Sequence, residues 1–256
     1  MPTSDQRMSA RRDLPAGGFS CWLRRTLAAL AEEGEADVPC GECSACCTTS
    51  HFVHVGPEET QTLARIPREL LFPAPGLPAG NVLMGYDEHG RCPMLTGGRC
   101  SIYEQRPLTC RTYDCRVFAA AGIAADSDPI TRQARRWRFS HPTRDDRDQH
   151  AAVRAAARFV RERAECFPGG AAPRDPVHVA LLAIDAYGVF LERGDEPGAT
   201  AQASSDLDVA RAVMEVNERF AAARAAAQTS PRAGRRGAAP VVGRAVHRDD
   251  QDEPGG

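Results

Sequence analysis

The sequence contains no lysine, and all 32 of its basic residues are arginine. This absence excludes a Schiff-base lysine and the lysine of a Walker-type phosphate loop. Aromatic residues are also scarce, at 6% of the 256 residues, whereas 42% of the residues are hydrophobic. We therefore expect a chain that buries a core of ordinary size, built largely from Ala, Leu and Val.

Long apolar runs are missing as well. No stretch of 18 apolar residues is present, so we expect no membrane-spanning helix. The apolar segment Trp22–Leu30 is short, is interrupted by Arg24 and Arg25, and is followed by acidic residues, which is not the pattern of a secretory signal. We therefore expect a cytoplasmic protein. The formal net charge of -2 argues against a strongly basic nucleic-acid-binding protein.

Cysteine, in contrast, is concentrated in one segment of the chain. Eight of the ten cysteines lie between Cys40 and Cys115. In a reducing compartment such a density of thiols indicates metal binding or catalysis rather than disulfide bonds.

The spacing of these cysteines favours metal. The first group has the pattern Cys40-x2-Cys43-x2-Cys46-Cys47, and the second has Cys92-x7-Cys100-x9-Cys110-x4-Cys115. A Cys-x2-Cys turn brings two thiolates to one ion, and reduced structural thiols are rarely packed so densely. The predicted metal ligands are Cys40, Cys43, Cys46, Cys47, Cys92, Cys100, Cys110 and Cys115.

The number and kind of metal stay open at this level. The side chains of Cys46 and Cys47 diverge, so the two residues serve different sites or one of them is spare or reactive. Eight thiolates would supply two tetrahedral zinc sites. Equally, the x2-x2 spacing of Cys40, Cys43 and Cys46 is seen in iron–sulfur ligation, and a later cysteine could complete a [4Fe–4S] cluster.

Arginine accompanies the later cysteines. Each of the four has an arginine directly beside it, and Arg106 lies between Cys100 and Cys110. Guanidinium groups favour thiolate over thiol and would offset the charge of a thiolate–metal centre. The alternative is that an arginine-rich composition puts arginine everywhere. The four neighbours are Arg91, Arg99, Arg111 and Arg116.

The cysteine segments resemble a known family. They read Cys40-Gly-Glu-Cys43-Ser-Ala-Cys46-Cys47, then Gly98-Arg-Cys100-Ser-Ile-Tyr103, then Arg106-Pro107-Leu-Thr-Cys110-Arg111 and Cys115. This pattern resembles the CxxCxxCC cysteine-cluster family, also called YkgJ-like, over about 76 residues. The resemblance implies a bacterial protein that chelates zinc or iron. A related domain occurs in flagellin lysine N-methylases, but this chain lacks a glycine-rich loop for the methyl-donor cofactor, so only the metal ligands are carried over.

Other candidate residues have simpler interpretations. His51 and His54 could be ligands, but we favour two histidines on a strand face, one exposed and one packed. Cys21 and Cys166 are expected to be small core residues. A basic run with an embedded Trp137 could bind single-stranded nucleic acid, although a solvated connector is more common. The run consists of Arg132, Arg135, Arg136, Arg138, Arg144 and Arg147.

The expected fold is α+β: a small, irregular, metal-stabilised cysteine-rich module with short hairpins, packed with flanking α-helices. Hairpin turns are expected at 87–90 and 96–99, and helices at 19–33, 57–66, 148–165, 177–191 and 205–223. The expected divisions are a disordered tail at 1–18, the cysteine module with its N-terminal helix at 19–120, a helical region at 121–228 and a disordered tail at 229–256.

The function expected from these residues is binding of zinc or iron, in a structural or accessory role. Two rivals stay open, an iron–sulfur protein with redox or protein-modifying activity and a metal buffer or chaperone. The sequence identifies no catalytic residues and no organic cofactor site, so whether the chain is an enzyme is left undecided. The expected partners are a metal ion and an unidentified protein, with neither nucleic acid nor membrane.

Overall fold

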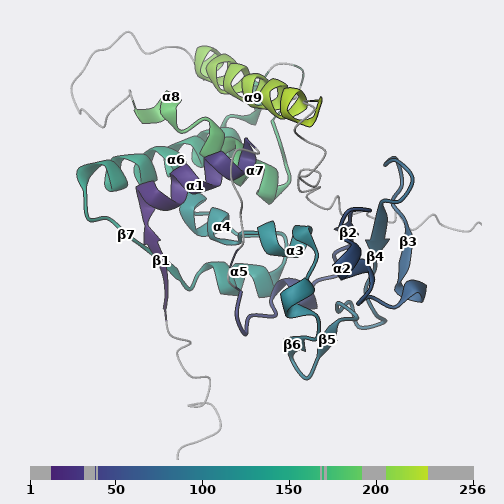
Figure 1. Cartoon of the computed structure of the whole chain (residues 1–256). Coiled ribbons are helices and arrows are strands. Elements are labelled where there is room, and N and C mark those ends of the chain that lie inside the picture. Colours follow the sequence, from purple (N-terminus) through teal and green to yellow (C-terminus); the bar gives the residue numbers. More distant parts are fainter. Residues whose placement is uncertain are drawn as a thin grey trace, which may run out of the picture. The chain divides into compact units, whose positions relative to one another are not determined.

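The computed structural model describes residues 13–31, 38, 40–167, 169, 172–191 and 206–229, with side chains to residue 219 in the last range. The fold is α+β, as predicted, and divides into two compact units. The helical unit comprises the described residues before Pro39 and from Thr112 onward, and the cysteine unit comprises Cys40–Arg111. Figure 1 shows the elements of both.

The helical unit is a cluster of helices with one small parallel sheet. Helix α6 packs against α1, α4, α7 and α8, and α9 packs on α7 and α8. The strands β1 (Leu14–Gly18) and β7 (Trp137–Ser140) pair in parallel. The helices are α1 (Phe19–Leu30), α4 (Arg116–Ala121), α5 (Asp128–Ala134), α6 (Arg144–Glu162), α7 (Pro176–Asp185), α8 (Gly188–Leu191) and α9 (Asp206–Thr229).

Helix α6 follows from its apolar stripe and its cap. The predicted stripe is buried from Val153 to Val160, whereas Ala164 is exposed because the helix ends at Glu162. The helix begins four residues before the predicted Asp148, because Thr143 caps it: Asp146 N–H donates to Thr143 Oγ1, and the Asp146 carboxylate accepts from Thr143 N–H. This reciprocal pair is a capping box.

Helix α1 belongs to the helical unit, although the sequence grouped it with the cysteine module. The Ser20 N–H donates to Asp146 Oδ1 on α6 at 2.8 Å, and Trp22 Nε1 donates to Asp114 at 2.9 Å. The ring of Phe19 is fully buried and stacks on His150 of α6, with ring centroids 4.2 Å apart. Sequence spacing showed the apolar face of α1 but not which surface covers it.

Helix α7 confirms the predicted N-cap and buried character. The Asp175 carboxylate accepts from the backbone N–H groups of Val177 and His178, and Pro176 occupies the first turn. The helix ends at Asp185, however, and α8 starts at Gly188, so the predicted continuous helix to Leu191 is broken at Ala186 and Tyr187. The predicted stop at Gly194 lies outside the described residues.

The pair β1–β7 was not predicted. Residues 14–18 were assigned to a disordered tail and residues 137–140 to a connector, yet they form a ladder with an irregularity between Pro15 and Gly17. Gly17 adopts a φ of 87°, which glycine tolerates without steric cost. Residues 14–18 do not alternate polar and apolar residues, so the sequence carries little strand periodicity there. Residues 137–140 do alternate apolar and polar side chains, and this signal was not used in the prediction. The predicted C-terminal tail after Thr229 lies outside the described residues.

The cysteine unit contains two small antiparallel sheets. In the first, β4 (Val82–Met84) lies between β2 (Val53–Val55) and β3 (Leu71–Pro73). The second is the hairpin of β5 (Leu95–Thr96) and β6 (Arg99–Cys100), which confirms the predicted turn at 96–99. The unit also contains α2 (Thr60–Leu63), much shorter than the helix predicted at 57–66, and the start of α3 (Leu108–Thr112).

One predicted hairpin is wrong. The turn at Asp87–Gly90 forms, since Gly90 N–H donates to Asp87 O and Asp87 N–H donates to Arg91 O. The strand β4 before it nevertheless pairs with β2 and β3, not with residues 91–95. Strand β3 lies in the Pro/Gly-rich stretch 67–80 that was predicted as loop. A proline is tolerated there because β3 is an edge strand.

The core of the cysteine unit is small. Its buried members are Val55, Ile66, Met84, Met94 and Ile102, and Cys92 and Cys100 pack against them. Two of the predicted ligands therefore sit at the edge of the apolar cluster, where their position is fixed by packing. Across the described part of the chain, no helix is long and apolar enough to cross a membrane.

Replacing Asp146 tests the α1–α6 connection. Its hydrogen bonds from Thr143 Oγ1 and Ser20 N–H lower the pKa of this carboxyl below its ordinary value. A carboxyl with a lowered folded-state pKa stabilises the fold above its unfolded pKa of about 4, and this stability is lost as the pH falls through the folded-state value. Asp146→Asn should therefore destabilise the helical unit at pH 7, with the difference from wild type shrinking progressively below about pH 4.

The measurement is urea unfolding followed by circular dichroism at 222 nm, at neutral and acid pH. Asp148→Asn is the matched control, because Asp148 forms an exposed ion pair with Arg144 on the same helix. Equal effects of the two substitutions at pH 7 would contradict the assigned role of Asp146.

Candidate metal centre

The first cysteine segment folds as successive tight turns. Cys43 N–H donates to Cys40 O at 2.9 Å, closing the first Cys-x2-Cys turn. Cys47 N–H donates to Ser44 O at 3.0 Å, and a short 3₁₀ turn spans Cys46–Thr48. The predicted turn geometry is thus present, with the cysteine side chains half-buried.

The second group of cysteines is brought to the first by backbone contacts. Cys92 N–H donates to Cys47 O at 2.8 Å, so residues 45 positions apart in sequence are adjacent. Cys100 lies on β6, beside the small core. Cys110 lies in α3, where its N–H donates to Pro107 O at 2.9 Å.

Glu59 supports the helix that carries Cys110. Its carboxylate accepts from Gly56 N–H at 2.9 Å and from Leu108 N–H at 2.6 Å. Thr109 Oγ1 also donates to His54 O at 2.9 Å. The sequence suggested only that Glu59 suits a helix start, and its distant partner Leu108 could not be found from local spacing.

Cys47 and Cys92 interact directly. The thiol of Cys47 donates a hydrogen bond to the Cys92 sulfur, which lowers the pKa of Cys92 to about 7. The same hydrogen bond, with burial and repulsion from Cys92, Cys110 and Cys46, raises the pKa of Cys47. In the metal-free chain the pair therefore shares one proton near neutral pH, with Cys92 as the thiolate.

Cys110 is the most buried of the interacting thiols. Burial raises the pKa of Cys110 to about 12, and repulsion from Cys92, Cys100 and Cys40 adds to the shift. Burial also raises the pKa of Cys100. Cys92 and Cys110 are thus common neighbours of several sulfurs. The sulfurs in this electrostatic contact, called the sulfur cluster below, are those of Cys40, Cys46, Cys47, Cys92, Cys100 and Cys110.

The donor chemistry of the sulfur cluster suits a soft or borderline metal such as zinc or iron. The side chains are not yet arranged around one point: among the residues that the structure describes, no three His, Cys, Asp or Glu side chains are placed to hold a metal ion together. Ligation therefore requires the cysteine side chains to turn toward a common centre.

A comparison with protein families bears on this cluster. Residues 39–127 match the CxxCxxCC family model. Its description is "Putative zinc- or iron-chelating domain", and the match covers about a third of the chain. The resemblance inferred from the cysteine pattern is confirmed for this segment. No curated protein and no solved structure matches the chain.

Not all predicted ligands of the CxxCxxCC segment lie in the cysteine unit. Cys43 is half-buried at the end of the first turn. Cys115 falls in the helical unit, directly before α4, and its sulfur accepts a hydrogen bond from Trp137 Nε1 at 3.3 Å. The ring of Trp137 is half-buried and faces the Arg116 guanidinium at 5.7 Å.

The two candidate histidines make polar contacts, and the two remaining cysteines differ in burial. His54 is buried in β2, and its Nε2 pairs with Asn81 Oδ1 at 2.8 Å. His51 lies before the strand, with its Nδ1 2.8 Å from Thr49 Oγ1. Cys166 packs against the core of the helical unit, as predicted, but Cys21 is exposed on α1, so its prediction as a core residue is wrong.

The arginines beside the cysteines divide by burial. Arg116 pairs with Asp114 at 2.8 Å, and the exposed Arg99 pairs with Glu42. Arg106 is buried, with 8% of its surface exposed, and its charge lowers the pKa of both Cys100 and Cys110 against the opposing effect of burial. The sequence placed Arg106 between these cysteines but gave no sign that it is buried, or that Arg116, with 20% of its side chain exposed, is largely removed from solvent as well.

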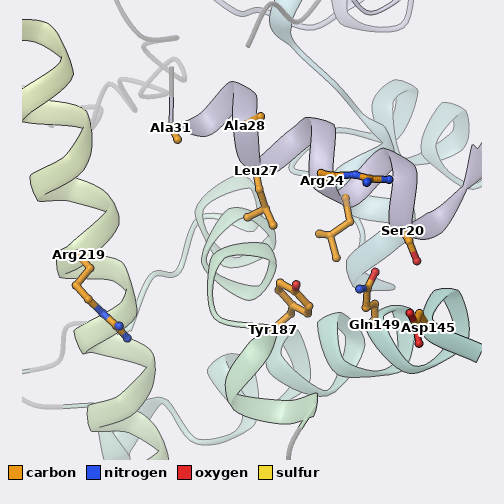
Figure 2. Close-up of a pocket in the computed structure, with 10 residues that line it drawn as sticks. Ser20, Arg24, Leu27, Ala28, Ala31, Asp145, Gln149, Tyr187 and Arg219 are labelled. Atoms are coloured by element: carbon orange, nitrogen blue, oxygen red, sulfur yellow. The ribbon is translucent and has the colours of Figure 1, made fainter. Parts of the chain in front are cut away.

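The helical unit contains a separate cavity of about 770 Å³ (Figure 2). The apolar part of its wall is formed by Leu23, Leu27 and Tyr187. Its cationic side chains are those of Arg24 and Arg219. Ser20, Asp145 and Gln149 complete its polar lining.

Thiol labelling of the metal-free chain tests the Cys47–Cys92 pair. At pH 7 iodoacetamide should modify Cys92 well before Cys110, because only a thiolate reacts. Cys47→Ala removes the hydrogen-bond donor and should slow the labelling of Cys92. The rates are read by peptide mass spectrometry, with the exposed Cys21 as an internal reference. Unchanged labelling of Cys92 in Cys47→Ala would refute the assigned hydrogen bond.

Proposed function

We propose that this chain binds zinc or iron through the sulfur cluster, and that the bound metal holds the cysteine unit in its folded form. The observation that carries the proposal is the contact between Cys47 and Cys92, whose backbones hydrogen-bond at 2.8 Å and whose thiols interact, because it joins the two distant groups of cysteines. The description of the matching family, zinc- or iron-chelating, agrees with it.

Energetics support a metal-dependent fold. The cysteine unit has short strands of two or three residues and only five residues in its buried apolar cluster. A core of this size rarely stabilises a domain of about 70 residues without a disulfide or a metal. A structural zinc contributes on the order of 10–16 kcal/mol of apparent binding free energy, comparable to the whole stability of a typical domain.

The proposed ligands are drawn first from Cys92 and Cys110, which interact electrostatically with each other and each with both Cys47 and Cys100. Cys40, Cys46, Cys47 and Cys100 are available around them. Because Cys46 and Cys47 are adjacent, we propose that they do not both ligate the same small ion. Cys43 and Cys115 remain predicted ligands from sequence spacing.

We propose a structural or accessory cellular role in the cytoplasm, with a protein partner served by the metal-stabilised unit. An iron–sulfur centre is the alternative. Full-length protein purified without oxygen should contain zinc or iron by elemental analysis. Absorbance near about 400 nm would identify an iron–sulfur cluster, whereas a zinc site is colourless. Protein with neither metal, and with no uptake of either on reconstitution, would refute the proposal.

Replacing one central ligand should unfold one unit selectively. Cys110→Ser should lower the bound metal and expose residues 40–111 to protease, while the helical unit stays resistant. Cys21→Ser is the matched control, because Cys21 is exposed and belongs to the helical unit.

The measurements are metal content, limited proteolysis with mass mapping, and circular dichroism, before and after treatment with a strong chelator. An unchanged digestion pattern in Cys110→Ser and in chelated wild type would contradict a structural metal. Release of metal to a moderate chelator without unfolding would instead favour a metal buffer.

A further inference from the structure

Tyr103 links the two cysteine segments. It begins a 3₁₀ turn, Tyr103–Gln105, that lies between Cys100 and Cys110. Its hydroxyl oxygen accepts a hydrogen bond from Gly41 N–H at 3.0 Å, inside the Cys40-x2-Cys43 turn. A side chain from the second group of cysteines thus holds the backbone of the first.

Arg106 holds Tyr103 in place. Its guanidinium carbon lies 4.1 Å from the centroid of the Tyr103 ring, within cation–π range. Its Nη1 donates to the Tyr103 backbone oxygen at 2.9 Å. The two residues thus form a compact pair in which the arginine covers the tyrosine ring.

Burial of Arg106 has a physical cost that its surroundings must offset. With 8% of the residue exposed, Arg106 loses most of its hydration, and such burial of a charged side chain is tolerated where negative charge compensates. Arg106 interacts electrostatically with the sulfurs of Cys100 and Cys110. A metal with four thiolates carries about two negative charges, so loading the centre strengthens the compensation.

We infer that Tyr103 and Arg106 are positioning residues for the metal centre: Tyr103 fixes the first cysteine turn, and Arg106 offsets the charge of a thiolate-rich centre. This inference rests on the proposed function. It predicts that the site prefers metal centres whose net charge is negative, such as one divalent ion bound by three or four thiolates.

The pair of Arg99 and Glu42 provides a control within the same unit. It also links the two cysteine segments, since Glu42 lies between Cys40 and Cys43 and Arg99 precedes Cys100. Its side chains are 71% and 80% exposed, so solvent screens the interaction. Exposed ion pairs contribute little to stability. Comparing Arg99 with Arg106 therefore separates the effect of a buried charge from the effect of linking the two cysteine segments.

The experiment measures zinc affinity of the full chain by competition with a chromophoric chelator, for wild type and four variants. Arg106→Met should weaken zinc binding about 10- to 100-fold, the range typical of residues that support metal ligands. Arg106→Lys keeps the charge and should recover a large part of the loss. Tyr103→Phe, which removes the acceptor of Gly41 N–H, should weaken binding about three- to tenfold. Arg99→Met should change it by less than about threefold.

Each outcome separates the alternatives. Equal affinities of Arg106→Met and Arg99→Met would overturn the role of Arg106, and an affinity of Arg106→Lys as low as that of Arg106→Met would overturn its assignment to charge. If Arg106→Met does not fold by circular dichroism, Arg106→Gln takes its place as the uncharged variant, and wild-type affinity in both Arg106→Gln and Tyr103→Phe would overturn the inference. A wild type that binds neither zinc nor iron would refute the proposed function itself.

Discussion

The constraint on which the cysteine unit depends is the repulsion among ionised sulfurs brought together by the backbone. In the metal-free chain this repulsion is reduced by protonation. Cys47 keeps its proton and shares it with Cys92, and burial keeps Cys110 protonated far above neutral pH. A divalent cation would replace those protons, so metal binding and proton release are coupled in this unit. The buried Arg106 acts in the same direction as the metal, at the side of the cluster near Cys100 and Cys110.

The two units are stabilised by different kinds of interaction. The helical unit relies on apolar burial along α6, on the capping box of Thr143 and Asp146, and on aromatic packing around Phe19. The cysteine unit has a far smaller apolar cluster and short strands, and it depends on specific polar contacts such as Glu59 with Leu108 N–H. Hydrogen bonds of this kind fix the positions of groups but contribute only modest net free energy to folding. A bound metal ion would supply the larger stabilisation that this unit needs.

Sequence reasoning found the parts of this structure that are encoded locally. The stripe on α6, the Asp175 cap of α7, the turn at 96–99 and the tight turns of the first cysteine segment all follow from short-range spacing. It missed β1 and β7, which pair with each other from far apart in the sequence, and β3, which pairs with the nearby β4 but lies in a stretch rich in proline and glycine. It grouped α1 with the cysteine module because the apolar face of an amphipathic helix does not indicate which segment packs against it. The cysteine pattern indicated metal, but the contacts of Glu59, Tyr103 and Arg106 arise from tertiary folding and leave no local pattern.

The boundary of the matching family segment has a practical consequence. Residues 39–127 extend past the cysteine unit and include α4, whose Val117, Phe118 and Ala120 are buried. Those side chains are covered by α6 and α7, which lie beyond residue 127. A fragment cut at the ends of the family match would therefore expose the apolar face of α4 to solvent and would tend to aggregate. A fragment ended at Arg111, where the chain crosses from one unit to the other, would leave out α4 but would also lose Cys115.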